Sequence, residues 1–147
     1  EAERVQEFEA NHPNHYLANL FIPNYDKDTR ELSYYNPDED TMISVSSTGD
    51  ISDEQDILRT EHEINELEVS KDTLQFDEAL NHARSTFEHD EGFRRIMGVL
   101  QTRDNTEWNI TFITNSFDVY NARLNASNGD ILTTSEDDVM SWIQGTT

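Results

Sequence analysis

Histidines at short spacings are among the side chains most able to do chemistry in this chain. His12 and His15 stand three residues apart, a spacing that on a helix brings two imidazoles close enough to share a zinc ion, but Pro13 interrupts such a helix. His82 and His89 stand seven apart, two turns of a predicted helix. We interpret all four as surface imidazoles and predict no metal and no cofactor.

Carboxylates with ligand-like spacing follow the first predicted strand. Asn24, Asp26 and Asp28 occupy alternate positions, as the first ligands of an EF-hand calcium loop do. That loop also needs glycine at its sixth position and a bidentate glutamate at its twelfth, where this sequence has Thr29 and Tyr35. We therefore interpret the segment as an acidic turn.

Signatures of catalysis are missing from the sequence. There is no GxSxG elbow, no glycine-rich phosphate loop and no HExxH motif. The chain has no cysteine, which excludes a thiolate nucleophile and a disulfide framework. We predict no catalytic residues. The alternative is an enzyme of the hydrolase class whose residues come together only in three dimensions.

A surface with few acidic side chains is the best candidate for binding. Residues 93–103 include three arginines and no acid, although the whole chain carries 31 acidic residues. Polar residues on the neighbouring strands share an outward-facing parity, and their amides and hydroxyls suit hydrogen bonds to a partner. The alternative is that this surface is covered within the fold and excludes acids for that reason. The predicted binding residues are Arg94, Asn109, Thr111, Asn121, Arg123 and Asn125.

An antiparallel meander must position these residues. Between Trp108 and Ile131, apolar and polar residues alternate in two runs, which is typical of strands with one buried face. Phe93–Gln101 is the strand before them, with Gly98 as a possible bulge. Phe76–His89 is predicted to be a helix, because its apolar residues recur at spacings of four, three and four.

The first third of the chain repeats this plan in outline. Residues 46–52, SSTGDIS, nearly match residues 126–132, ASNGDIL, and in each the glycine supplies the positive φ of a turn. We infer a duplication. The predicted elements before the first turn are a helix over Glu1–Asn11 and strands over Tyr16–Ile22, Arg30–Tyr35 and Thr41–Ser46.

These elements predict an α+β fold of two tandem halves, each a helix with an antiparallel meander. The halves are residues 1–52 and 73–147, joined by an acidic connector over residues 53–72, and a C-terminal helix opens near Ser135. Leu67 and Val69 are predicted to anchor the connector in an extended crossing. The predicted core consists of Phe8, Leu20, Ile43, Val45, Phe76, Leu80, Phe87, Trp108, Ile110, Phe112 and Leu124.

The charge of the chain is its strongest compositional feature. Thirty-one acidic residues face 10 basic ones, for a formal net charge of -21, and only two of the basic residues are lysines. Acid-rich, lysine-poor surfaces resemble those of proteins from extreme halophiles, in which salt screens the repulsion. We expect a salt-accumulating cytoplasm, or alternatively an extracytoplasmic place with a removed anchor or signal. The charge opposes binding to nucleic acid, and no segment is apolar enough to insert into a membrane.

The second half resembles the PepSY domain, a small cystatin-like unit. The resemblance rests on the helix with FDEAL at residues 76–80, the strand Trp108–Phe112, and Asn121–Ile131 with its glycine turn. The tandem arrangement is similar to small archaeal proteins with two such halves. The resemblance implies a noncatalytic binding or regulatory module, or a peptidase-inhibitor-like one, that engages a protein or peptide through a sheet face or edge.

Overall fold

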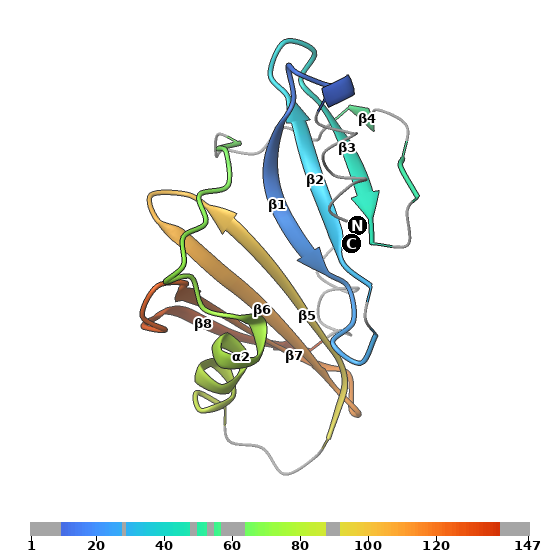
Figure 1. The fold of residues 1–147 in the computed structure, drawn as a ribbon. Coiled ribbons are helices and arrows are strands. Elements are labelled where there is room, and N and C mark those ends of the chain that lie inside the picture. The colour runs from blue at the N-terminus through green and yellow to red at the C-terminus, as the bar shows by residue number, and fades with distance from the viewer. Residues whose placement is uncertain are drawn as a thin grey trace.

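The computed structural model describes residues 10–27, 29–47, 50–52, 55–56, 64–87 and 92–138. Eight antiparallel strands form one sheet in the order β4-β3-β2-β1-β5-β6-β7-β8, and helix α2 packs on it (Figure 1). The strands and the helix are β1 (Tyr16–Ile22), β2 (Glu31–Asn36), β3 (Thr41–Ser46), β4 (Gln55–Asp56), α2 (Phe76–Arg84), β5 (Phe93–Thr102), β6 (Thr106–Thr114), β7 (Asp118–Asn125) and β8 (Ile131–Asp138).

The predicted fold class is wrong, because the two meanders form a single sheet. Strand β1 pairs with β5, with Leu20 opposite Leu100 and Ile22 opposite Gly98. This pairing provides hydrogen-bond partners for the backbone groups of two strands that would otherwise lie at sheet edges. The chain is therefore a mainly-β protein whose α2 has nine residues, and not two helix-plus-meander halves.

The prediction of a C-terminal helix is also wrong. Ser135, where that helix was expected to open, pairs with Asn121 inside β8. Isoleucine and threonine at residues 131–134 favour an extended strand, and this preference wins over the capping pattern of Ser135 and Asp138. Residues 139–147, most of the predicted first helix and Phe8 lie outside the described residues.

Individual elements agree closely with the sequence pattern. Tyr16–Ile22 and Thr41–Ser46 are strands with the predicted bounds. Helix α2 begins after Gln75, whose backbone N–H donates to the Glu78 carboxylate at 3.2 Å, and acids occupy its first turn. The helix ends at Arg84, earlier than predicted.

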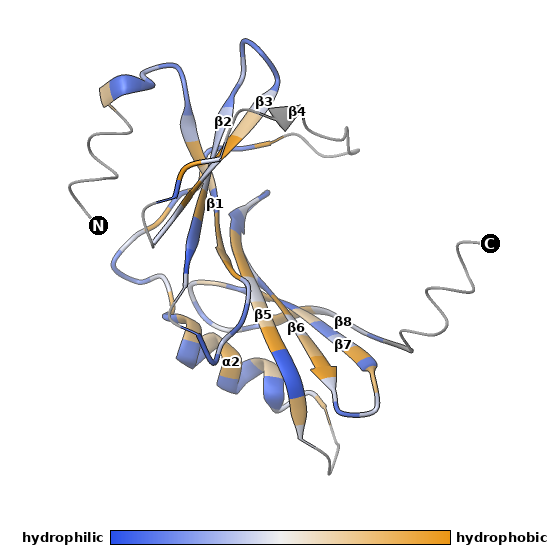
Figure 2. Ribbon diagram, turned by 90° about the vertical axis from the view of Figure 1, so that its right-hand side faces the viewer, coloured by the Kyte–Doolittle hydropathy of each residue, from blue (hydrophilic) through white to orange (hydrophobic). Residues whose placement is uncertain are grey.

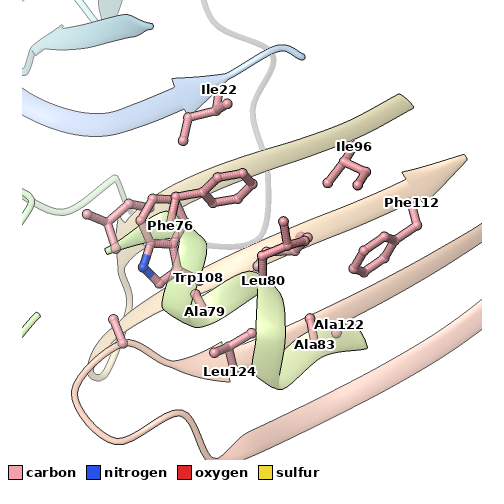
Figure 3. Close-up of a cluster of buried hydrophobic side chains, with 13 residues drawn as sticks. Ile22, Phe76, Ala79, Leu80, Ala83, Ile96, Trp108, Phe112, Ala122 and Leu124 are labelled. Carbon is pink, nitrogen blue, oxygen red and sulfur yellow. The ribbon is translucent and has the colours of Figure 1, made fainter. Parts of the chain in front are cut away.

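The main core lies between α2 and the sheet (Figure 3). The Trp108 ring is 2 % exposed, and its Nε1 donates to the Leu74 carbonyl at 3.0 Å. Leu20 and Phe87 are partly buried against this cluster. A smaller cluster of Tyr34, Ile43 and Val45 lies among β2 and β3. The predicted core residues that the structure describes are thus buried or packed against the core.

The sheet bends strongly between its two ends. In Figure 2, β1 to β3 rise from the layer formed by β5 to β8, and α2 lies beneath that layer. The helix contacts β6 and β7. It therefore covers only part of one face of the sheet, and this limit matters for the hollow described below.

Gly98 is not a bulge. It pairs in regular register with Ile110 on one side and Ile22 on the other. A Cβ at this position would lie 2.5 Å from Cε1 of the Phe76 ring. The absence of a side chain therefore lets the first residue of α2 pack directly on the backbone of β5.

A backbone hydrogen bond to the aspartate of each glycine-containing segment is present, but the two bonds do not start from equivalent positions of the repeat. The Asn125 N–H donates to the Asp130 carbonyl at 2.8 Å, and the Ser46 N–H donates to the Asp50 carbonyl at 2.8 Å. Gly129 has φ of 80°, a value that glycine adopts without strain. Gly49 lies outside the described residues.

Candidate binding surface

Four of the predicted binding residues lie together on the sheet face opposite α2. Thr111 is opposite Asn121, and Asn109 is opposite Arg123, on strands β6 and β7. All four side chains are partly exposed. The structure therefore brings together Asn109, Thr111, Asn121 and Arg123, which we call the polar face.

Hydrogen bonds within the polar face organise its amides. The Asn121 Nδ2 donates to Oδ1 of Asn109 at 2.5 Å and to Oγ1 of Thr111 at 3.0 Å. A cross-strand ladder of this kind fixes the side-chain rotamers. Much of the hydrogen-bonding capacity of the ladder is thus used inside the chain.

Arg123 forms an ion pair with the same chain. Its Nε and Nη2 donate to the two oxygens of Glu107 at 2.8 and 3.0 Å, and the Glu107 residue is 4 % exposed. The hydrogen bond to Glu107 raises the pKa of the Arg123 guanidinium, against the lowering effect of burial. Sequence reasoning missed Glu107, although its alternation with Asn109 places both on one face.

The other two predicted binding residues make contacts of their own within the chain. Arg94 sits where the β5 register shifts, and its guanidinium carbon lies 4.8 Å from the centre of the Phe117 ring. Asn125 accepts the Ser127 N–H at 2.7 Å through its side chain, so it closes the turn after β7. Asn125 is opposite Glu107, on the same side of the sheet as Arg123, and so borders the polar face, whereas Arg94 does not join it.

The histidines are also separated in space from the polar face. The rings of His12 and His15 meet edge to face, 5.1 Å apart. The His82 ring lies over Gly129, with its Nε2 2.6 Å from where a Cβ would stand. His89 lies outside the described residues. Among the described residues, no group of three or more histidine and carboxylate side chains is arranged to hold a metal ion.

Strand β8 is the structural feature that the sequence analysis missed. It pairs with β7, and no other strand of the described residues pairs with its outer edge. Residues 131–136 are exposed, and Leu132 is 48 % exposed. The β-branched residues in ILTT were the signal for this strand. Thr133 and Ser135 lie opposite Arg123 and Asn121, so the polar face reaches this edge.

Comparisons with known proteins bear on the fold alone. The chain is similar to the crystal structure of a "putative lipoprotein" from Clostridium difficile 630, with a TM-score of 0.60 and 12% identity over 92% of this chain and 91% of that one. The two proteins share a fold. No protein-family model matches the sequence, and no curated protein matches it. The PepSY resemblance and the archaeal origin therefore stay predictions.

Across the parts of the chain described above, no helix is long and apolar enough to cross a bilayer.

Proposed function

We propose that this protein is a noncatalytic binding module that takes up an extended peptide segment of a partner protein along the outer edge of β8. The observation that carries this proposal is the edge itself, which no described strand pairs and whose residues 131–136 are exposed. A peptide can add to such an edge through main-chain hydrogen bonds. Side chains at alternate positions then give specificity.

The chemistry of the partner follows from charge and exposure. A net charge of -21 disfavours a second copy of this chain, because two such surfaces repel each other. Leu132 offers an exposed apolar contact, and Glu136 is exposed towards the end of the strand. The favoured occupant is a segment that alternates apolar and basic residues. Thr133, Ser135 and the polar face would accept polar side chains beside it.

The enzyme alternative has less support in the described residues. Tyr25 and Arg123 have raised pKa values, and neither is a general acid or base near neutral pH. A peptidase-inhibitor-like role is compatible with peptide binding at an edge, and it is a narrower form of the same proposal.

The test uses a fluorescein-labelled peptide of eight residues, the length of β8, that alternates isoleucine, threonine and lysine. We expect saturable anisotropy with the native protein, and a loss of about tenfold or more in affinity with Leu132→Lys, because the new cation repels the peptide. Ile51→Lys is the matched control, because Ile51 is 55 % exposed and lies near β3 instead.

A second peptide separates strand pairing from simple attraction of charges. It has the same charge, with prolines replacing two of the residues, so those two positions cannot donate to a ladder. We expect no binding of this peptide. Equal binding of both peptides would contradict the proposal, as would a dimer through β8 in sedimentation experiments.

We further propose that the acidic surface is an adaptation to high salt. The charge of -21 supports this, and a salt-accumulating cytoplasm is the favoured compartment. The name of the structural neighbour favours the extracytoplasmic alternative, since a lipoprotein is held at a membrane by its lipid. Cell fractionation with an antibody against the native protein distinguishes the two compartments.

A further inference from the structure

A hollow opens on the α2 side of the sheet, away from the polar face. Its volume is about 390 Å³, within the range of sites for small molecules. It lies among the connector before α2, the first turn of α2, and strands β1, β5 and β6. This position distinguishes it from the edge of β8.

The hollow results from the limited reach of the helix. Helix α2 packs on β6 and β7, whereas Leu20 and Leu100 project from β1 and β5 on the same face. Among the described residues, the connector and Phe76 of α2 lie over these two strands. In Figure 3, Ile22 of β1 lies across from Phe76 at the start of the helix. Leu100 is 4 % exposed beneath this cover, whereas Leu20 is partly buried, so Leu20 supplies the accessible part of the floor.

The rim of the hollow is held in place by the connector. The Leu74 N–H donates to the Ala126 carbonyl at 2.7 Å, and the Ser70 N–H donates to Oγ1 of Thr73 at 3.0 Å. Leu67 anchors the segment through its N–H, which donates to the Leu17 carbonyl at 2.7 Å. The site is therefore largely preformed, which lowers the entropic cost of binding.

The charges at the rim are unusual for this chain. Lys71 and Arg30 both line the hollow, although basic residues number 10 against 31 acidic ones. Among the ion pairs between described residues, none involves Lys71 or Arg30. The acidic residue in the lining, Asp77, hydrogen-bonds with Tyr25. Two basic residues thus line the hollow beside apolar ones, and Nη1 of Arg30 also donates to the Lys27 and Thr29 carbonyls, each at 3.1 Å.

Apolar side chains complete the rim. Val69 is 60 % exposed, a high value for a valine, and it lines the hollow together with Leu74. Burying Val69 under a ligand would remove apolar surface from water, which is favourable by about 25 cal/mol per Å². The sequence analysis expected Val69 to anchor the connector, but its exposure leaves it free to contact a ligand.

We propose that this hollow binds a small amphiphilic anion, with its apolar body against Leu20, Val69 and Leu74 and its anionic group at Lys71 and Arg30. The overall charge repels anions, so an anion is held only where cations and apolar surface occur together. This site is independent of the peptide edge, and Leu132→Lys leaves it intact.

The test compares two dyes that differ in charge. 8-Anilinonaphthalene-1-sulfonate is an apolar anion, and N-phenyl-1-naphthylamine is its neutral analogue; both fluoresce when they enter an apolar site. We expect Lys71→Gln to lower the affinity for the anionic dye about fivefold, because one charge-assisted contact is lost. The affinity for the neutral dye should not change. Lys27→Gln is the matched control, because Lys27 is the other lysine and is not among the lining residues.

A second variant tests the apolar half of the site. Val69→Asp should lower the affinity for both dyes. Because Val69 is exposed, the fold should tolerate the change. Circular dichroism confirms that each variant stays folded, which excludes dye binding to a loosened core. No binding of either dye to the folded native protein would overturn the proposal. Equal effects of Lys71→Gln and Lys27→Gln would overturn it as well.

Discussion

The Glu107 carboxylate is held at both oxygens by the Arg123 guanidinium, with Nε–Oε1 at 2.8 Å and Nη2–Oε2 at 3.0 Å. The acid comes from β6 and the arginine from β7. Because the Glu107 residue is 4 % exposed, its charge is compensated inside the sheet and not by water. The pair fixes the end of the polar face nearest the turn after β5.

Removing the arginine should destabilise the protein. We expect Arg123→Met to lower the free energy of unfolding by about 2–4 kcal/mol, since it leaves a buried carboxylate without its main partner. The Arg123 side chain is 27% exposed, so solvent screening keeps the loss below that of a fully buried pair. Urea denaturation at neutral pH measures it.

Arg103 supplies the control for this prediction. Its Nε lies 3.6 Å from Oε1 of Glu107, and its side chain is 37% exposed. Arg103→Met should therefore lower stability by less than about 1 kcal/mol. If the two variants lose the same stability, the bidentate geometry at Arg123 has no special role.

A methyl group at Gly98 should be poorly tolerated. We expect Gly98→Ala to destabilise the protein by about 1–3 kcal/mol, because the new Cβ would stand 2.5 Å from the Phe76 ring. Phe76 is 7% exposed, so its ring cannot swing into solvent at no cost. Thermal unfolding measures the change.

A smaller side chain at position 76 tests the cause of that change. The double variant Gly98→Ala with Phe76→Leu should lose less free energy of unfolding than the sum of the losses in the two single variants. Gly92→Ala is the milder comparison, because the contact there is 3.2 Å to Nδ2 of Asn115. Simple additivity of the two changes at 76 and 98 would argue against a direct contact.

Stability should fall at high pH through Tyr25. The Asp77 carboxylate, which hydrogen-bonds with the Tyr25 hydroxyl and repels its anion, raises the pKa of Tyr25 above its ordinary value. The unfolded state releases the proton of the Tyr25 hydroxyl near a pH of about 10, whereas the folded state still keeps it there. This contribution is fully present below the unfolded pKa and is lost as pH rises through the folded pKa.

Two variants test the pH dependence. Tyr25→Phe should lose less stability than the native protein as the pH rises past about 10, and Asp77→Asn should bring the pKa of Tyr25 back down. Urea midpoints across the alkaline range and ultraviolet titration of the phenol measure these effects. An unchanged phenol titration in Asp77→Asn would rule out this carboxylate as the cause.

Salt should stabilise the native protein. With a net charge of -21, repulsion among surface acids opposes the compact state, and added ions screen it. We expect the thermal midpoint to rise steadily from low to molar KCl. A flat or falling midpoint would rule out adaptation to salt as the reason for the charge.

The sequence predicted β6 and β7 well because their side chains alternate regularly, whereas it missed β8. Trp108, Ile110 and Phe112 mark one buried face, and the structure buries all three. Helix α2 was also recognisable from its periodic apolar residues. These local signals depend on neighbours within a few positions, so one chain is enough to read them.

The joining of the two meanders could not be predicted in this way. Nothing local to Leu20 or Leu100 specifies that these residues pair, since the contact joins distant parts of the chain. Glu107 was missed for a related reason, because its burial depends on Arg123 across the strand pair. The hollow beside Lys71 depends on where α2 stops covering the sheet, which is a property of the assembled fold.

The pairing of β1 with β5 also has a consequence for synthesis on the ribosome. β1 emerges from the ribosome before β5, yet its partner on one side is residues 98–101. Until β5 has been made, that side of β1 keeps its backbone groups unpaired and Ile22, which is 1 % exposed in the finished fold, uncovered. The nascent chain thus carries an open strand edge until residues 98–101 have been made, the stage at which a chaperone would protect it best.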